Sequence, residues 1–299
     1  MHNPPRLAFP ALIVANLVLA AGPWLVRLCQ QEAAIGPVAA GFWRLALALP
    51  FLAFIAVRQQ RGQPFPAWTL VAAVAIGGIF FAADLAAWHA GILRTKLANA
   101  TLFGNFASFI FTIYGFILLR RAPRAVQLAA LALAAVGTVL LIGNSYEMSR
   151  AHFAGDLLAL LAGLFYAFYL VAVDRARQTM KPWPVLAIAT AGGALPILIF
   201  ALAIGEPVMP QDWAPVIALS VSSQLIGQGL LVYAMGHLSP VVTGLCFLTQ
   251  PIASAAIGWI AFQERLSSQD WIGALLICAA LVLIRVPERK NGGEAAVRY

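Results

Sequence analysis

The stretch YAMGHLSP at residues 233–240 has a counterpart 144 residues earlier, HAGILRTK at residues 89–96. The same gapless shift lays residues 10–142 onto residues 154–286. Apolar segments and their breakers coincide along the whole overlap, although few letters are identical. Self-similarity at a fixed period indicates a repeated structural unit. The chain is therefore predicted to consist of two related halves.

The composition indicates a chain that lies in lipid. Of the 299 residues, 62% are hydrophobic and only 10% are charged, and the mean hydropathy is +0.87. About 20 apolar residues span a bilayer as a helix, and backbone groups in lipid must be satisfied within the helix itself. The fold class is predicted to be an all-α polytopic membrane protein with ten transmembrane helices, at 10–28, 37–57, 68–92, 97–119, 123–142, 154–173, 183–204, 213–236, 240–262 and 268–286.

Five crossings per half force the second half to lie inverted relative to the first. Thirteen Lys and Arg residues fall at one set of span ends and five at the other, a bias that places both termini in the cytoplasm. Residues 143–153 are then an extracytoplasmic connector between two five-helix repeats, and residues 287–299 a cytoplasmic tail. The net charge of +8 reflects this topology. The sequence has no clustered basic face, so nucleic-acid binding is not expected.

Motifs of common enzymes are missing from the sequence. There is no HExxH, GxSxG or P-loop, and no soluble catalytic domain is predicted. The three cysteines, Cys29, Cys246 and Cys278, have no CxxC spacing, so neither a disulfide framework nor a metal site is expected. We expect no cofactor and no enzymatic activity.

Three ionisable residues lie deep within predicted spans. Arg44 and Asp84 each lie seven or eight residues from the outer end of a span, about 10–12 Å below the surface. Because ionisable groups are costly in hydrocarbon, each is a functional candidate. The two are predicted to form an ion pair, which is either purely structural or broken by substrate or a proton. His89 is the third candidate for coupling, with an interhelical hydrogen bond as the alternative.

Polar residues also recur on single helix faces. Gln224 and Gln228 lie four residues apart, and the 144-residue shift makes Gln228 the counterpart of Asp84. Counterparts in inverted halves are expected to face each other across a central cavity, although interhelical hydrogen bonds would give the same pattern. Together with nearby amides and aromatic rings, the predicted substrate-binding set is Trp24, Phe80, Asp84, Trp88, Thr101, Asn105, Tyr166, Gln224, Gln228 and Gln250.

Glycines and prolines interrupt several predicted spans. Pro23 follows Gly22 late in the first span, and Pro251 follows Gln250 in the ninth. Such residues serve either as hinges near a ligand or as sites of close helix packing.

The order and spacing of several short stretches resemble those of the drug/metabolite transporter superfamily, in its EamA type. The stretches are GFWRLA at 41–46, YAMGHLSP at 233–240, Pro251, and QERLS at 263–267. The first half departs from the pattern at LRRAP, residues 119–123, where the acidic residue is missing. Within the superfamily the chain is most similar to aromatic amino acid exporters. The resemblance implies efflux of aromatic and other neutral amino acids across the bacterial inner membrane.

These observations predict a multi-pass secondary transporter in which one five-helix half rocks against the other. Its partners are an amino acid substrate and membrane lipid, and it is expected to be a monomer or weak dimer. A drug or other small-metabolite efflux carrier of the same fold is the main alternative. An intramembrane enzyme or a channel is the alternative from another class.

Overall fold

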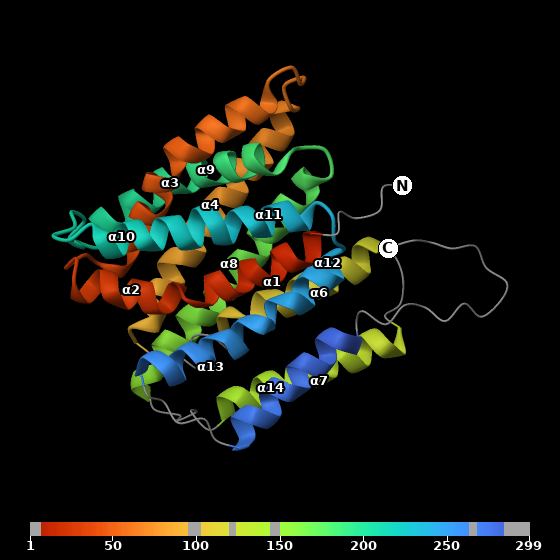
Figure 1. Cartoon of the computed structure of the whole chain (residues 1–299). Helices are drawn as coiled ribbons and strands as arrows, with labels where there is room; N and C mark the ends of the chain where they lie inside the picture. The colour runs from red at the N-terminus through yellow and green to blue at the C-terminus, as the bar shows by residue number, and fades with distance from the viewer. Residues whose placement is uncertain (1–6, 95–102, 120–123, 144–149, 263–267, 284–299) are drawn as a thin grey trace.

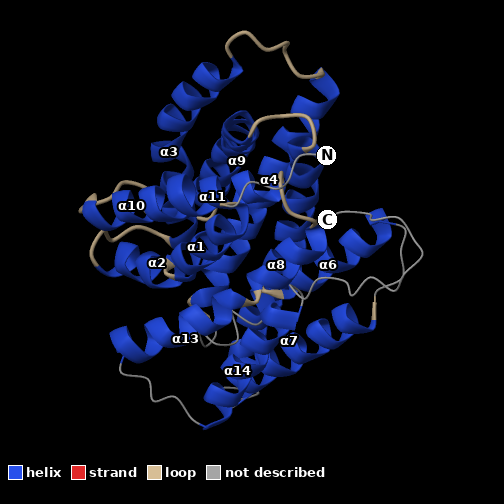
Figure 2. Cartoon of the chain, turned by 45° about the vertical axis from the view of Figure 1, so that its right-hand side comes forward, coloured by secondary structure: helices blue, strands red, loops and turns tan. Residues whose placement is uncertain are grey.

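The computed structural model describes residues 7–94, 103–119, 124–143, 150–262 and 268–283. Within these ranges every regular element is a helix, as Figure 2 shows. The helices are α1 (Ala8–Ala20), α2 (Gly22–Gln31), α3 (Pro37–Gln60), α4 (Trp68–Ile92), α6 (Phe106–Leu119), α7 (Ala125–Gly143), α8 (Arg150–Arg177), α9 (Pro182–Ala203), α10 (Ala214–Leu219), the π-helix η1 (Ser220–Gln228), α11 (Gly229–Met235), α12 (Pro240–Phe247), α13 (Thr249–Phe262) and α14 (Ser268–Leu283).

Six helical segments in the described ranges are long and apolar enough to cross a membrane: Ala8–Gln31, Pro37–Gln60, Trp68–Ile92, Phe153–Arg177, Pro182–Ala203 and Ala214–Met235. Shorter apolar helices lie at Phe106–Leu118, Ala125–Gly137, Pro240–Ser254 and Trp271–Ala280. An all-helical multi-pass protein is thus confirmed. The number of ten crossings and the cytoplasmic termini stay predictions.

Two predicted regions can be compared only in part. Helix α8 begins at Arg150, earlier than the predicted span start at 154. Residues 144–149 of the predicted connector and all of the predicted tail, 287–299, lie outside the described residues.

The outer surface carries many large apolar side chains. Phe51 is 62% exposed, Ile117 70% and Leu195 62%. A water-soluble monomer rarely exposes extended apolar surface. These side chains therefore face hydrocarbon, and they explain why the helices need so few charges.

The buried side chains form two main packed groups. The larger group joins α1 to α4 with α8 to α11, and it also includes Phe111 of α6 and Cys246 and Phe247 of α12. The smaller group joins α7, α12 and α14, with partly buried side chains of α6 and α13 against it. Figure 1 shows α7 and α14 lying side by side at one edge of the molecule. Each group contains helices from both halves of the sequence.

Helix pairing follows the 144-residue shift. Helix α3 packs against its counterpart α9, and α7 packs against its counterpart α14. Helix α4 packs against α8, and the counterpart of α4, the segment from α10 to α11, packs against α1 and α2. This is the pairing that a twofold relation between the halves would produce.

Glycines bring α4 and α9 into close contact. A Cβ atom on Gly78 would collide with the backbone carbonyl of Ala189, and one on Gly193 would lie 2.5 Å from the carbonyl oxygen of Gly78. These two glycines therefore permit close packing of α4 against α9.

The α3–α9 pair is tied at both ends. At one end Gly36 N donates to Pro207 O at 3.0 Å, and Trp43 Nε1 donates to Val208 O at 2.6 Å. At the other end the Trp183 backbone N donates to Gln59 Oε1 at 3.2 Å. These bonds join the first half of the sequence to the second.

Candidate functional site

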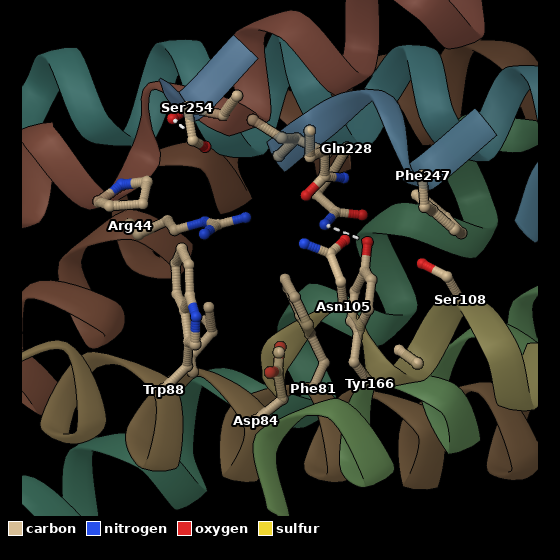
Figure 3. Close-up of a pocket in the computed structure, with 17 residues that line it drawn as sticks. Arg44, Phe81, Asp84, Trp88, Asn105, Ser108, Tyr166, Gln228, Phe247 and Ser254 are labelled. Carbon is tan, nitrogen blue, oxygen red and sulfur yellow. Dashed lines mark hydrogen bonds between the residues drawn. The ribbon is translucent and has the colours of Figure 1, made fainter. Parts of the chain in front are cut away.

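A small cavity lies where the larger helix group meets α6, α12 and α13 (Figure 3). Its volume is about 80 Å³. Ligand pockets are usually about 300–1,000 Å³. The cavity in this conformation therefore suits a small solute, and it must widen for an aromatic one.

Two helix interruptions border the cavity. Asn105 is a turn residue immediately before α6, and Leu248 separates α12 from α13. Under the 144-residue shift Asn105 corresponds to Thr249, the neighbour of Leu248. Thr249 Oγ1 donates to the freed carbonyl of Cys246 at 2.7 Å. Irregular backbone at membrane depth is tolerated where it is buried in protein or lines a cavity, so both breaks are typical of a ligand site.

A third interruption lies in the first span. Only Ala21 separates α1 from α2, and Pro23 lies in the first turn of α2. Proline lacks the N–H that would continue the preceding helix. Pro23 lines the cavity, which places this break at the site as well.

Arg44 reaches the cavity from α3 and is only 4% exposed. Its Nε atom donates to Gln224 Oε1 at 3.2 Å, and its guanidinium lies 5.4 Å from the centre of the Phe81 ring. Its Nη groups have no acceptor among the described residues. Figure 3 shows them pointing into the opening. A buried cation is thus oriented but incompletely paired.

Asp84 lines the same cavity from α4. Within the described chain its carboxylate has no hydrogen-bond or ion-pair partner, so the direct Arg44–Asp84 ion pair expected from sequence is not formed. Figure 3 shows the two side chains on different sides of the opening. The cation and the anion face one space instead of each other.

Gln228 connects the cavity to two tyrosines of α8. Tyr169 donates its hydroxyl hydrogen to Gln228 Oε1 at 3.2 Å. Gln228 Nε2 donates to the Tyr166 hydroxyl oxygen at 3.2 Å. Tyr166 lines the cavity and acts here as an acceptor, so its own hydroxyl hydrogen is left for another partner.

Gln250 is held by a residue that sequence reasoning missed. Gln250 Nε2 donates to Asn16 Oδ1 at 2.8 Å, and Asn16 Nδ2 donates to the Cys246 carbonyl at 3.0 Å. Asn16 is fully buried. Its signal was its place as an amide within an otherwise apolar span, but both partners lie more than 200 positions away.

The segment that carries Gln224 is a π-helix, η1, between two α-helical pieces. π-Helical turns occur frequently at functional sites. Here the turn directs two side chains onto one target, because Ser220 Oγ donates to the Arg44 carbonyl at 2.9 Å while Gln224 accepts from Arg44 Nε. Gln224 Nε2 also donates to Thr190 Oγ1 at 3.0 Å. Gln224 therefore positions Arg44.

The structure brings many of the predicted site residues together. The cavity is lined by Arg44, Asp84, Trp88, Asn105, Tyr166, Gln228 and Gln250. Gln224 lies behind Arg44 and is fully buried. Thr101 lies outside the described residues.

Besides Gln224, three described candidates do not line the cavity. Trp24 is 39% exposed. The ring of Phe80 packs against Phe168 of α8 at 5.1 Å between centroids. His89 is fully buried, and its Nδ1 donates to the Pro37 carbonyl at 2.8 Å. Its Nε2 has no partner among the described residues, so His89 matches the predicted structural alternative.

Sequence reasoning also passed over lining residues. Phe81 lines the cavity, and its signal was its spacing, three residues before Asp84 and seven before Trp88 on one helix face. Ser254 donates to the Ala20 carbonyl at 3.5 Å across the cavity wall. Other lining residues are Leu19, Pro23, Leu85, Gly104, Ala107, Ser108 and Phe247.

A larger hollow of about 760 Å³ lies between α4, α8 and α9. Its walls are almost entirely apolar, and several lining side chains such as Ile79 and Phe200 are about half exposed. Among the described residues, Glu206 and Arg94 are the only charged ones that line it. Since convergent polar groups are missing, the smaller cavity is the better candidate site.

The described residues hold no group of three or more His, Cys, Asp or Glu side chains that could bind a metal ion. The described cavity wall offers hydrogen-bonding, charged and aromatic side chains.

Comparisons with known proteins agree with a transport role. The model of the EamA-like transporter family matches residues 7–143 and 153–286. An uncharacterized transporter of Archaeoglobus fulgidus is 24% identical over 283 residues, which cover 91% of this chain and 95% of the relative. A second uncharacterized transporter of that organism is 24% identical over 205 residues, covering 69% and 73%. A protein crystal structure with 18% identity has a TM-score of 0.75 and covers 93% of this chain and 96% of its own.

Proposed function

Because this chain belongs to the EamA-like transporter family, we propose that it exports amino acids, aromatic and other neutral ones, across a bacterial inner membrane by alternating access. The observation that carries this proposal is the composition of one cavity. Aromatic side chains of Trp88, Tyr166 and Phe247 share its wall with neutral amides of Gln228 and Gln250. A small solute that is partly apolar and carries hydrogen-bonding groups suits such a wall.

The cavity volume adds a preference among substrates. At about 80 Å³ the space favours small neutral amino acids in this conformation. Export of aromatic amino acids requires a wider state, and the helix breaks at Ala21, Asn105 and Leu248 are the points at which the wall can move.

The packing supports a particular division of moving parts. The side chains that line the cavity come from the larger helix group and from α6, α12 and α13, and each packed group mixes both halves of the sequence. Alternating access around this cavity therefore takes place by motion of the smaller group against the larger. Rocking of one five-helix half against the other would break the α3–α9 ties at both ends.

A drug or small-metabolite carrier of the same fold is the second candidate. The large apolar hollow between α4, α8 and α9 favours it, because an apolar compound could dwell there. A channel or an intramembrane enzyme has less support, since the cavity is small and the described residues that line it form no catalytic constellation.

Counterflow in proteoliposomes tests the proposal. Vesicles that hold purified protein and a high internal concentration of unlabelled alanine, threonine or phenylalanine should accumulate the same labelled amino acid transiently and saturably. Empty vesicles and vesicles without internal substrate are the controls. Accumulation of labelled drugs but of no amino acid would overturn the proposal, and conductance without saturation would indicate a channel.

A further inference from the structure

Only two charged side chains line the described cavity, and they carry opposite signs. Arg44 enters from α3 and Asp84 from α4. Neither is neutralised by the other, because no ion pair joins them in the described part of the chain. Removing a charge from water is costly unless a partner replaces the water. Among the described residues, each charge therefore lacks an ion-pair partner.

The orientation of Arg44 shows which of its atoms are available. Nε donates to Gln224 Oε1 at 3.2 Å, and the Ser220 hydroxyl donates to the backbone carbonyl of Arg44 at 2.9 Å. The two Nη groups remain, and they point into the cavity (Figure 3). Two parallel N–H donors from one guanidinium match the two oxygens of a carboxylate.

The Asp84 carboxylate offers the complementary chemistry. While it is ionised its oxygens only accept hydrogen bonds, and a primary ammonium group presents three donors. Trp88 lies one turn further along the same face of α4 and also lines the cavity. An apolar substituent beside the ammonium would therefore meet an indole ring.

We propose that this site recognises the zwitterion of an α-amino acid, with the substrate carboxylate on the Arg44 Nη groups and its ammonium on Asp84. This inference rests on the proposed function and deepens it. Both charges of the substrate must be present, because a molecule with one charge leaves the other protein charge buried and unpaired.

The two-pole site separates substrate classes. An amine without a carboxylate meets Asp84 but repels Arg44, and a carboxylic acid without an amine does the reverse. A phosphorylated metabolite would need more than one cation to neutralise it, and Arg44 is the only cation that lines the described cavity.

Competition in the counterflow assay tests this assignment. Uptake of labelled phenylalanine is measured against three matched competitors: unlabelled phenylalanine, phenethylamine, which lacks the carboxylate, and 3-phenylpropionate, which lacks the ammonium. Alanine, ethylamine and propionate form a smaller series for the same test. In the unaltered protein the zwitterion should inhibit uptake at a concentration about 10- to 100-fold lower than either analogue requires. This factor is expected for the loss of a charge-assisted hydrogen bond.

Two substitutions should shift that selectivity in opposite directions. Asp84→Asn should weaken binding of the zwitterion and make the acid-only analogue a better competitor relative to the zwitterion. Arg44→Gln should improve the amine-only analogue relative to the zwitterion. The exposed residues Arg58 and Asp212 provide matched controls, because Arg58→Gln and Asp212→Asn make the same chemical changes away from the cavity.

The outcomes are separable. If no amino acid shows counterflow in the folded, unaltered protein, the proposed function fails. If amino acids are exported but an amine or acid alone competes as well as the zwitterion, or both substitutions weaken all competitors in parallel, the zwitterion assignment fails. If Arg44→Gln does not fold, Arg44→Lys replaces it, because lysine keeps the positive charge but lacks the two parallel N–H donors. This variant should bind the zwitterion more weakly but should still discriminate against the amine.

Discussion

Gln224 accepts a hydrogen bond from the Nε atom of Arg44 at 3.2 Å, although 180 positions separate the two residues in the sequence. We predict that Gln224→Leu raises the substrate concentration for half-maximal transport about 3- to 15-fold, with less effect on the maximal rate. The reason is loss of one interhelical hydrogen bond, which costs about 0.6–1.7 kcal/mol in membrane proteins, and loss of orientation of the guanidinium.

Counterflow kinetics measure this effect. Ser222→Ala is the matched control in the same π-helix, since the Ser222 hydroxyl bonds only to the carbonyl of Ala218 in its own segment. An unchanged half-saturating concentration in Gln224→Leu, accompanied by reduced thermal stability, would assign Gln224 a purely structural role.

The two tyrosines that hold Gln228 should differ in effect. Tyr166→Phe removes a cavity hydroxyl and the acceptor for Gln228 Nε2. Tyr169→Phe removes only the donor behind Gln228. A net hydrogen bond is worth about 0.5–1.5 kcal/mol, so we expect Tyr166→Phe to reduce substrate affinity up to about tenfold. Tyr169→Phe should mainly reduce stability. Binding and melting curves of both variants separate these effects, and equal losses of affinity would contradict the assignment.

The close contact at Gly78 predicts a loss of stability on substitution. In Gly78→Ala the added methyl group collides with the Ala189 carbonyl, and overpacking costs about 1–3 kcal/mol. The melting temperature should fall by several degrees. Gly22→Ala is the control, because its Cβ would meet nothing closer than the Ser223 hydroxyl at 3.7 Å. A Gly78→Ala protein as stable as Gly22→Ala would show that α4 and α9 are less tightly packed.

Glu206, outside the membrane-spanning segments, predicts a pH effect on stability. Burial raises the pKa of its carboxyl group above the ordinary value, although the backbone N–H groups of Ala39 and Val38 oppose this shift. The folded state therefore binds this proton more tightly than the unfolded chain does. The resulting contribution to stability is full below the ordinary glutamate pKa of about 4.3 and is lost as the pH rises through the higher pKa of the folded state.

Glu206→Gln should remove that pH dependence while an amide oxygen still accepts from Ala39 N, which lies 2.9 Å from the carboxylate. Melting temperatures of both proteins, measured in steps from pH 4 upward, check this expectation. If the unaltered protein became more stable relative to Glu206→Gln as the pH rises, the prediction would be wrong.

Distances between spin labels can identify the moving parts. Phe54 of α3, Leu195 of α9 and Val136 of α7 are all exposed and can carry labels in a background without the native cysteines. If the smaller helix group moves against the larger, substrate should change the distance between positions 54 and 136. The distance between positions 54 and 195 should stay constant. Rocking of the two sequence halves predicts the reverse, because positions 54 and 136 belong to the same half.

The sequence predicted the helical membrane fold well, because hydropathy alone determines which segments prefer lipid. It also predicted Arg44 and Asp84 to lie near one another, and both line the cavity, since 1.5 Å per residue converts sequence position into distance along a helix. It did not predict that the two charges remain apart, because their separation depends on how far α3 and α4 are rotated about their axes.

The errors at the site have equally local causes. The predicted set included Phe80, but the spacing from Asp84 and Trp88 on one helix face favours Phe81, which lines the cavity. Asn16 was overlooked because its partners at Cys246 and Gln250 lie 230 and 234 positions away. The pattern of polar residues also does not predict the π-helix, because a π-helix differs from an α-helix in its backbone hydrogen bonds and not in its residue composition.

The pairing of distant helices has a consequence for synthesis. A ribosome that adds about 5–20 residues per second needs about 9 to 36 s to pass from Arg44 to Gln224, positions that are 180 residues apart. During most of that interval the nascent first half holds Arg44 and Asn16 without their later partners, and α3 and α7 lack α9 and α14. Insertion chaperones and membrane proteases would meet this half-made bundle first. The two halves made as separate polypeptides should each be short-lived alone and should protect one another when produced together.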